Sequence, residues 1–206
     1  MYKGPFNRGQ RCVVVCDGFY EWQTTKNTKT KQPYFIYMPQ PDGVKIEDPN
    51  TWGTDFDEEN GWKGPRLLQM AALFDVWKSS EGDEIYSYTI ITLESNETLS
   101  WLHHRMPAIL ESDEELSSWL DYGEVDAENA LKYIKPVKVL LYHSVSTLVN
   151  NSRKKDAICN KPMKEEDVKE KKLSKSADLM KSWLSGSKRS NQIKDESPSK
   201  VCKKEE

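Results

Sequence analysis

The stretch CVVVCDGFYEW, residues 12–22, decides the expected fold of this chain. Its first part, residues 12–16, is an apolar, β-branched run that predicts a short buried strand, and Asp17-Gly18 predicts a turn. Residues 19–22 are rich in aromatic side chains and again favour a strand. The next residues, 24–31, are polar and basic and precede another strand at residues 33–38, so we expect a β-hairpin.

The rest of the front part continues in short elements. We expect further strands at residues 67–77, 86–93, 105–110 and 137–145, with a turn at residues 79–83. Short helices are expected at residues 95–102, at 112–120, where Ser112 and Glu115 form a capping box, and at 126–134, stopped by Pro136. Residues 39–65 contain four prolines and many acids and predict a long surface loop.

Charge and aromatic content divide the chain into two parts. Residues 153–206 hold 16 of the 30 basic and 10 of the 33 acidic residues, a net charge of +6, and residues 1–152 keep 14 and 23, a net charge of −9. Every Tyr and Phe, and every Trp except Trp183, lies in the first part. Burial of large apolar side chains offsets the loss of chain entropy on folding. We therefore predict one globular domain over residues 1–155 and a disordered charged tail over residues 156–206.

Cysteine use and hydropathy point to an intracellular, soluble protein. The four cysteines, at positions 12, 16, 159 and 202, do not form a disulfide framework, which indicates a reducing compartment. No apolar stretch approaches the roughly 20 residues of a membrane span. The start of the chain also shows no secretory signal pattern.

The negative net charge of residues 1–152 comes from two acidic segments, and the other residues of this part have a positive net charge. Residues 42–60 contain seven acids and one Lys, and residues 111–128 contain eight acids and no base. Outside these two segments, residues 1–152 hold 13 bases and 8 acids, a net charge of +5. A basic face that attracts nucleic acid is therefore compatible with this acidic domain.

Glu21 is the first candidate for chemistry. It lies among Phe19, Tyr20 and Trp22, directly after the expected buried strand. A carboxylate in aromatic surroundings loses solvation, which favours its neutral form and suits a general acid or base. The alternative is that Glu21 points to solvent from an alternating strand.

The second candidate is the run His103-His104-Arg105. Histidine transfers protons near neutral pH, and arginine offers a fork of donors that matches phosphate. The alternative is a pair of surface histidines at the end of a helix. A zinc site is not expected, because His103, His104 and His143 lack cysteine partners at ligand spacing. Cys16 beside Asp17 is a weaker nucleophile candidate, since buried cysteine is usually an inert apolar residue.

Several motifs in series resemble one family. Residues 12–22, KQPYFIY at 31–37, YTIIT at 88–92 and HHRMPAIL at 103–110 closely resemble the SRAP (SOS response-associated peptidase) family in order and spacing. Residues 142–152 resemble its last strand. The resemblance covers about residues 1–155.

The resemblance implies an α+β fold with a mixed, mainly antiparallel, β-barrel-like core and peripheral helices. It also implies binding of single-stranded DNA and capture of abasic sites through a thiazolidine crosslink to an N-terminal cysteine. By position, Glu21 and His103 match the family's catalytic residues, and Trp22, Arg105 and Thr92 match its DNA-binding residues. Stacking of a base on an aromatic such as Trp22 is worth about 1–3 kcal/mol.

The same resemblance sets the expected partners. We expect single-stranded DNA with abasic sites and proteins of the replication fork, a nuclear location at chromatin and a monomeric chain. Neither a cofactor, a metal ion nor a membrane is expected.

One departure from the family leaves two functions open. Met1 is followed by Tyr2 rather than by cysteine, so we expect this chain to lack the family's N-terminal segment and its nucleophile, and to expose unpaired sheet edges. The first function is that of the family's abasic-site sensor and enzyme, with peptidase and lyase activity. The second is a truncated, catalytically inactive module that binds single-stranded DNA. A peptidase that uses Cys16 and His103 is a third hypothesis.

Overall fold

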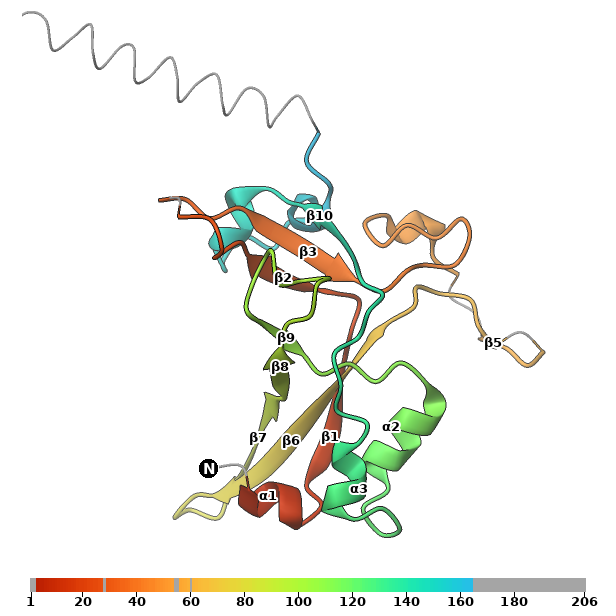
Figure 1. The fold of residues 1–206 in the computed structure, drawn as a ribbon, viewed down its shortest axis with the longest axis vertical. Helices are drawn as coiled ribbons and strands as arrows, with labels where there is room; N and C mark the ends of the chain where they lie inside the picture. Colours follow the sequence, from red (N-terminus) through yellow and green to blue (C-terminus); the bar gives the residue numbers. More distant parts are fainter. Residues whose placement is uncertain (1–2, 28, 54–55, 60, 165–206) are drawn as a thin grey trace, which may run out of the picture. The chain divides into compact units, whose positions relative to one another are not determined.

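The computed structural model describes residues 3–27, 29–53, 56–59 and 61–164 (Figure 1). The strands in this part are β1 (Arg11–Cys16), β2 (Phe19–Trp22), β3 (Pro33–Tyr37), β4 (Phe56–Asp57), β5 (Gly61–Trp62), β6 (Leu68–Lys78), β7 (Glu84–Ile90), β8 (Thr92–Glu94), β9 (Arg105–Pro107) and β10 (Leu141–Ser144). The helices are α1 (Lys3–Asn7), α2 (Asp113–Leu120), α3 (Ala127–Leu131) and the 3-10 helices η1 (Pro49–Thr51), η2 (Thr147–Asn150) and η3 (Ala157–Asn160).

Two three-stranded antiparallel sheets form the framework. The first has the order β1-β6-β7, and the second has the order β10-β3-β2. The long strand β6 pairs with β1 through Ala71 and Val13, and with β7 through Phe74 and Tyr88. The predicted hairpin is confirmed, because β2 pairs antiparallel with β3, which places Glu21 opposite Tyr34.

A short ladder links the two sheets. Strand β8 pairs antiparallel with β9, so that Thr92 lies opposite Pro107 and Glu94 lies opposite Arg105. The amide of Ile91, between β7 and β8, donates to the carbonyl of Ala71 at 2.9 Å. The amide of Ala108 then donates to the carbonyl of Ile91, also at 2.9 Å. The ladder is thereby fixed against β6.

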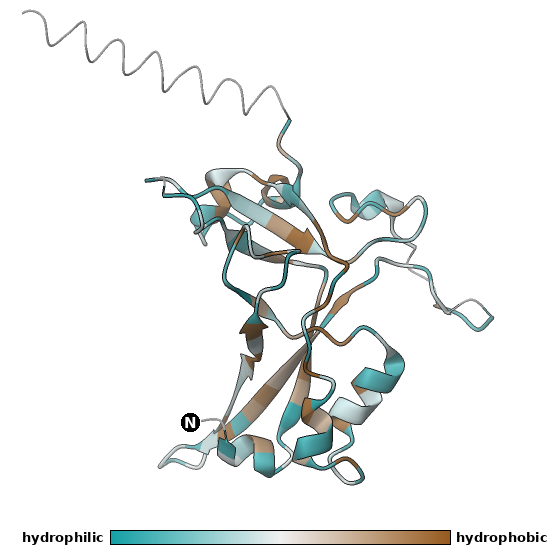
Figure 2. Ribbon diagram, in the orientation of Figure 1, coloured by the Kyte–Doolittle hydropathy of each residue, from teal (hydrophilic) through white to brown (hydrophobic). Residues whose placement is uncertain are grey.

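Apolar side chains from both sheets meet in one core. Its buried members come from β3, β6, β9 and the segments between strands: Ile36, Met38, Leu68, Met70, Leu99, Leu102, Met106, Ile109, Val137 and Leu140. In Figure 2 the hydrophobic colour is concentrated on strands such as β6 and β3, and the hydrophilic colour on α2 and the outer loops. The prediction of an α+β class with mainly antiparallel strands and peripheral helices is confirmed, and the described strands form separate sheets.

The helices begin where their caps predict. The Ser112 hydroxyl accepts from the Glu115 amide at 3.2 Å at the start of α2. The Asp126 carboxylate accepts from the Asn129 amide at 2.8 Å at the start of α3. Helix α2 packs on β1, and its Trp119 indole donates to the carbonyl of Cys12 at 2.9 Å.

Four expectations about local structure need correction. Residues 12–16 are half-buried rather than buried, and Val15 is 56% exposed, because β1 is an edge strand. Within the expected helix at residues 95–102, residues 97–102 form hydrogen-bonded turns and no α-helix is found. The last strand contains only residues 141–144 of the expected 137–145. Finally, the loop at residues 39–65 includes η1, β4 and β5, and its Ile46 is buried.

The described chain stays ordered beyond the expected domain boundary at residue 155. Helix η3 contains the buried Cys159, and the Met163 amide donates to the carbonyl of Ser144 at 2.9 Å. The compact unit that contains the strands extends to Met163. The rest of the expected tail lies outside the described residues, and its disorder stays a prediction.

Candidate functional site

A pocket of about 310 Å³ lies where the two sheets and the β8–β9 ladder meet. Nine residues line it: Phe19, Glu21, Met70, Ile90, Thr92, His103, Arg105, Met106 and Pro107. Four of the five residues that the resemblance matched to the family's site are in this set, namely Glu21, Thr92, His103 and Arg105. The structure therefore brings together a carboxylate, a hydroxyl, an imidazole and a guanidinium that are up to 84 positions apart in the chain.

Strand alternation aims Glu21 at the pocket. Side chains two positions apart on a strand share a face, so Phe19 and Glu21 both face the pocket. The Glu21 Oε1 accepts a hydrogen bond from the Trp22 amide at 3.0 Å, which fixes the carboxylate near the strand. The carboxylate is half-buried in the wall of the pocket.

Trp22 is the candidate that does not line this pocket. It follows Glu21 directly and therefore points to the other face of β2. There its indole donates to the Asn150 side-chain oxygen at 2.7 Å, and Tyr20 on the same face packs against Phe35 at 5.2 Å between ring centroids. The expected contact of Trp22 with DNA stays a prediction, and it would have to occur outside this pocket.

Hydrogen bonds join the end of β2 to the turn that carries His103. The Thr24 amide donates to the carbonyl of Leu102 at 2.9 Å. The buried side chain of Gln23 donates to the carbonyl of Trp101 at 3.3 Å. Leu102 is fully buried. These contacts keep His103 next to the strand that carries Glu21.

The backbone of Arg105 supports the His103 ring. The His103 Nδ1 lies 3.1 Å from both the amide nitrogen and the carbonyl oxygen of Arg105. The Arg105 amide donates to Nδ1 when this nitrogen carries no proton, and an Nδ1–H donates to the Arg105 carbonyl when it does, so the roles depend on the tautomer of the ring. In either tautomer the Arg105 backbone orients the ring at the pocket.

Arg105 is fixed by neutral acceptors. Its Nε donates to the Thr92 hydroxyl at 2.9 Å, and its Nη2 donates to the same hydroxyl at 2.6 Å and to the Thr92 carbonyl. Glu94 is its cross-strand neighbour in the ladder, but none of the ion pairs among the described residues involves Arg105. The guanidinium is therefore oriented while its charge stays available to an anion.

The other residues considered for chemistry lie elsewhere. Cys16 packs against the core at the end of β1, and burial, followed by the charge of Asp17, raises the pKa of its thiol. Its thiolate, the nucleophilic form, is thereby disfavoured. His143 lies on β10 with its Nε2 at 2.6 Å from the carbonyl oxygen of Asn160. His104 is exposed and contacts the His103 ring at 4.4 Å between centroids.

Metal-binding clusters and membrane-spanning helices are absent from the described residues, those up to 164 with the gaps given above. These residues contain no group of three or more His, Cys, Asp or Glu side chains that is arranged to hold a metal ion. None of their helices is long and apolar enough to cross a membrane.

The apolar wall of the pocket was not predicted from the sequence. Met70, Ile90, Met106 and Pro107 come from β6, β7 and β9 and were assigned no role. The place of Phe19 in the pocket could have been predicted, because Phe19 lies two positions before Glu21 on the same strand. Nothing in the sequence marked the other four residues as pocket residues, since apolar residues in strands usually belong to a core.

The arrangement suits a small polar group attached to an anion. Glu21 and His103 offer proton acceptors and donors in a partly apolar pocket, and Arg105 at the same pocket offers an uncompensated positive charge. A sugar that carries a phosphate has both features.

A family model described as SOS response associated peptidase (SRAP) matches residues 1–152. The chain is 47% identical over 187 residues to "Abasic site processing protein HMCES" of Pongo abelii, covering 89% of this chain and 52% of that protein. It is 30% identical over 146 residues to "Abasic site processing protein YoqW" of Bacillus subtilis, covering 70% of this chain and 54% of that protein. The chain thus spans about half the length of the curated relatives that it matches.

Solved structures share the fold. A crystal structure of a protein from Bacteroides thetaiotaomicron matches with a TM-score of 0.58 at 23% identity, covering 79% of this chain and 60% of that one. A protein from Bordetella bronchiseptica matches with a TM-score of 0.51 at 18% identity. At these identities the likeness concerns the fold alone.

Proposed function

Since the chain belongs to the SOS response associated peptidase (SRAP) family, we propose that it acts on abasic sites in DNA as part of the DNA damage response. The relatives named as abasic site processing proteins support this role. The single observation that carries the proposal is the pocket that contains Glu21, Thr92, His103 and Arg105.

The DNA bound is single-stranded. In single-stranded DNA no complementary strand has to be displaced before the abasic sugar enters the pocket. Its 3′ phosphate pairs with Arg105, and the opened sugar lies between Glu21 and His103. Trp22 stacks on a neighbouring base outside the pocket. The protein acts as a monomer in the nucleus, at chromatin and replication forks with their proteins.

Glu21 and His103 move protons in this proposal. A ring-opened abasic sugar carries an aldehyde, and an amine that attacks it must lose a proton before water leaves. Glu21 accepts that proton while protonated His103 gives a proton to the carbonyl oxygen, which forms a carbinolamine. Glu21 then returns its proton to the hydroxyl, water leaves, and a protonated C=N bond replaces the C=O bond. The family's thiazolidine crosslink and self-processing of the N-terminus add a cysteine that has a free α-amine beside its thiol.

A second candidate function is favoured by the sequence. Each of the four cysteines, at positions 12, 16, 159 and 202, lies within the chain, so its nitrogen is a peptide nitrogen rather than a free amine. In this second function the protein binds abasic single-stranded DNA without forming a thiazolidine through these cysteines. Glu21, His103 and Arg105 still form the binding pocket in this case.

One experiment tests binding and separates the two functions. The full chain is titrated against three fluorescent single-stranded oligonucleotides that contain an abasic site, a tetrahydrofuran analogue or a normal base, and each mixture is then run on a denaturing gel. Tighter binding to the abasic oligonucleotide supports the proposal. A heat-stable shifted band selects the crosslinking function, and equal affinity for all three oligonucleotides refutes recognition of abasic sites.

A further inference from the structure

The segment that connects β2 to β3 is basic. Residues 23–41 contain three lysines, Lys26, Lys29 and Lys31, and no acid. All three lysines are exposed, and none of the ion pairs among the described residues involves them. We call residues 24–27 and 29–31 the lysine loop. Its charge is available to an anion that comes from outside.

Hydrogen bonds fix the base of the lysine loop. The Gln23 amide donates to the carbonyl of Gln32 at 3.0 Å, which closes the base. The Gln32 side chain also donates to the carbonyl of Val145 at 2.8 Å. Figure 1 shows the loop at one end of the sheet β10-β3-β2. The lysines therefore extend from a fixed base at this end of the sheet.

The lysine loop begins beside the turn that carries His103. The amide and the hydroxyl of Thr24 donate to the carbonyl of Leu102 at 2.9 and 3.3 Å. The Thr25 hydroxyl donates to the carbonyl of Trp101. Lys26 follows Thr25 directly in the chain, so the positive charge begins next to the segment that leads into the pocket. A DNA strand that has a sugar in the pocket has the lysine loop beside it.

Three aromatic rings connect the pocket wall with the other end of the loop. Tyr34, three positions after Lys31, lies opposite Glu21 in the pairing of β2 with β3. Its ring lies 5.0 Å from the ring of Trp101, between centroids. The Tyr142 ring packs 4.7 Å from the same tryptophan, and Tyr142 is 45% exposed. Aromatic rings beside positive charge are the combination with which proteins bind the bases and phosphates of single strands.

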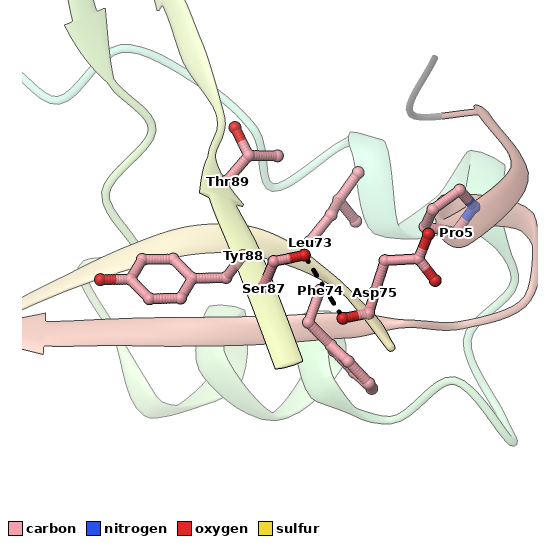
Figure 3. A pocket seen from close by; sticks show the side chains of 7 residues that line it. All are labelled: Pro5, Leu73, Phe74, Asp75, Ser87, Tyr88 and Thr89. Carbon is pink, nitrogen blue, oxygen red and sulfur yellow. Dashed lines mark hydrogen bonds between the residues drawn. The ribbon is translucent and has the colours of Figure 1, made fainter. Parts of the chain in front are cut away.

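A pocket on the sheet β1-β6-β7 lacks this combination (Figure 3). It has a volume of about 330 Å³ and is lined by Pro5, Leu73, Phe74, Asp75, Ser87, Tyr88 and Thr89. Figure 3 shows the Ser87 hydroxyl donating to the backbone carbonyl of Asp75, at 3.5 Å. Of the described residues that line this pocket, Asp75 alone is charged, and it pairs with Arg8 at 3.5 Å. The lining of this pocket therefore offers no cation to a phosphate.

We propose that the lysine loop binds, through Lys26, Lys29 and Lys31, the phosphates of a DNA single strand on one side of the abasic site. This inference rests on the proposed function, because that function places the abasic sugar in the pocket. The bases of the same stretch pack on Trp101 and Tyr142. The loop supplies affinity that does not depend on the lesion, whereas the pocket supplies the preference for abasic sites.

The test compares three fluorescent single-stranded oligonucleotides, titrated with the full chain at low salt. The first has an abasic site with about two nucleotides on each side, the second adds about eight nucleotides on the 5′ side, and the third adds them on the 3′ side. We expect one extension to raise the affinity about tenfold and the other to have a much smaller effect, since the loop lies at one end of the pocket. The effective extension should lose most of this gain when its linkages are uncharged methylphosphonates.

Lysine substitutions locate the contact. Lys26→Gln, Lys29→Gln and Lys31→Gln together should remove the gain from the extension and leave the affinity for the short oligonucleotide unchanged. The slope of log K against log salt concentration should become less steep by about 0.7 for each lysine replaced. Lys29→Gln alone should change the slope by about 0.7, so the test does not depend on the folding of the triple variant.

A second triple variant is the matched control. It replaces Lys3 on α1, Lys45 after β3 and Lys132 after α3 with glutamine, and all three are exposed. This variant loses the same charge away from the lysine loop, so it should keep the gain from the extension.

Three results would overturn the proposal. The first is a full gain from the extension in the variant that lacks the loop lysines. The second is an equal loss of gain in the control variant, which would assign the effect to net charge. The third is a loss of affinity for the short oligonucleotide as large as for the extended one. Equal affinity for short oligonucleotides with an abasic site and with a normal base refutes the proposed function instead, and a lysine-dependent gain beside it still supports binding by the loop.

Discussion

The amide of Thr24 donates a hydrogen bond to the carbonyl of Leu102 at 2.9 Å. This contact joins two segments that are 78 positions apart. One begins directly after the strand that carries Glu21, and the other ends directly before His103. Together with the Gln23 contact to Trp101, it explains why the carboxylate and the imidazole line one pocket.

Gln23→Met tests this link. The change removes a buried side-chain hydrogen bond and keeps the volume, so we expect a loss of about 1 kcal/mol in the free energy of unfolding. Affinity for abasic single-stranded DNA should fall about threefold, because the His103 turn loses a contact with β2. Urea unfolding and fluorescence anisotropy measure the two effects.

Gln40→Met is the matched control for Gln23→Met. Gln40 makes similar contacts to the carbonyls of Met38 and Arg66, at 2.7 and 3.1 Å, away from this pocket. Gln40→Met should lower the free energy of unfolding and leave the affinity for DNA unchanged. If both variants lower the affinity for DNA by the same factor, the contact of Gln23 with Trp101 has no special role in positioning His103.

Thr92→Val should weaken DNA binding through Arg105. The change removes the hydroxyl that accepts from Arg105 Nε and Nη2, so we expect about fivefold lower affinity. Thr92→Ser keeps the hydroxyl and should bind normally. In an Arg105→Gln background, Thr92→Val should have no further effect. A persistent loss there would indicate a direct contact of Thr92 with DNA.

Arg105→Gln should change the salt dependence of binding. Neutralising one phosphate of a single strand contributes about −0.7 to the slope of log K against log salt concentration. We therefore expect the slope to become less steep by about that amount. Lys138→Gln, at an exposed position between α3 and β10, is the control. An unchanged slope in the Arg105 variant would mean that the guanidinium meets no phosphate.

Glu115 should make stability depend on pH in the acid range. Burial raises its pKa, but the hydrogen bonds from Lys135 and the Glu111 amide outweigh burial and lower the pKa overall. A depressed pKa in the folded state stabilises the fold above the ordinary value near 4.5. This contribution is lost as the pH falls through the lower folded value.

Glu115→Gln should therefore cost stability at neutral pH and little at low pH. We expect a loss of about 1 kcal/mol at pH 7, because Lys135 is half exposed and solvent screens the pair. The difference from the unmodified chain should shrink below about pH 4. Chemical unfolding at several pH values measures it, with Glu114→Gln on the same helix as control. A pH-independent difference would contradict the assignment.

The strands were predictable because their signals are local. The β2–β3 hairpin follows from two β-rich runs around a polar turn, and the starts of α2 and α3 follow from Ser112 and Asp126. The α-helix expected at residues 95–102 was not found. Asn96 and Thr98 bond instead to the carbonyls of Val137 and Lys138, at 2.7 and 3.0 Å. Such long-range partners are not visible in a single sequence.

The sequence was enough to predict which residues form the site, but not how they are arranged in space. The motifs around Glu21 and His103 indicated their chemistry, but their convergence depends on contacts between distant segments. The position of Trp22 was available from strand alternation, because neighbours on a strand face opposite sides. The apolar wall formed by Met70 and Met106 was not available, since buried methionine usually indicates only a core.

The most direct test of the central claim follows the methionine methyl groups by NMR. Met70 and Met106 line the pocket of Glu21 and His103, whereas Met38 lines another pocket. On titration with an abasic single-stranded oligonucleotide, we predict shifts of the Met70 and Met106 signals, no shift of Met38, and no shifts in a Glu21→Gln, Arg105→Gln variant. Shifts of Met38 alone, or equal shifts with an oligonucleotide that has no abasic site, would contradict the account.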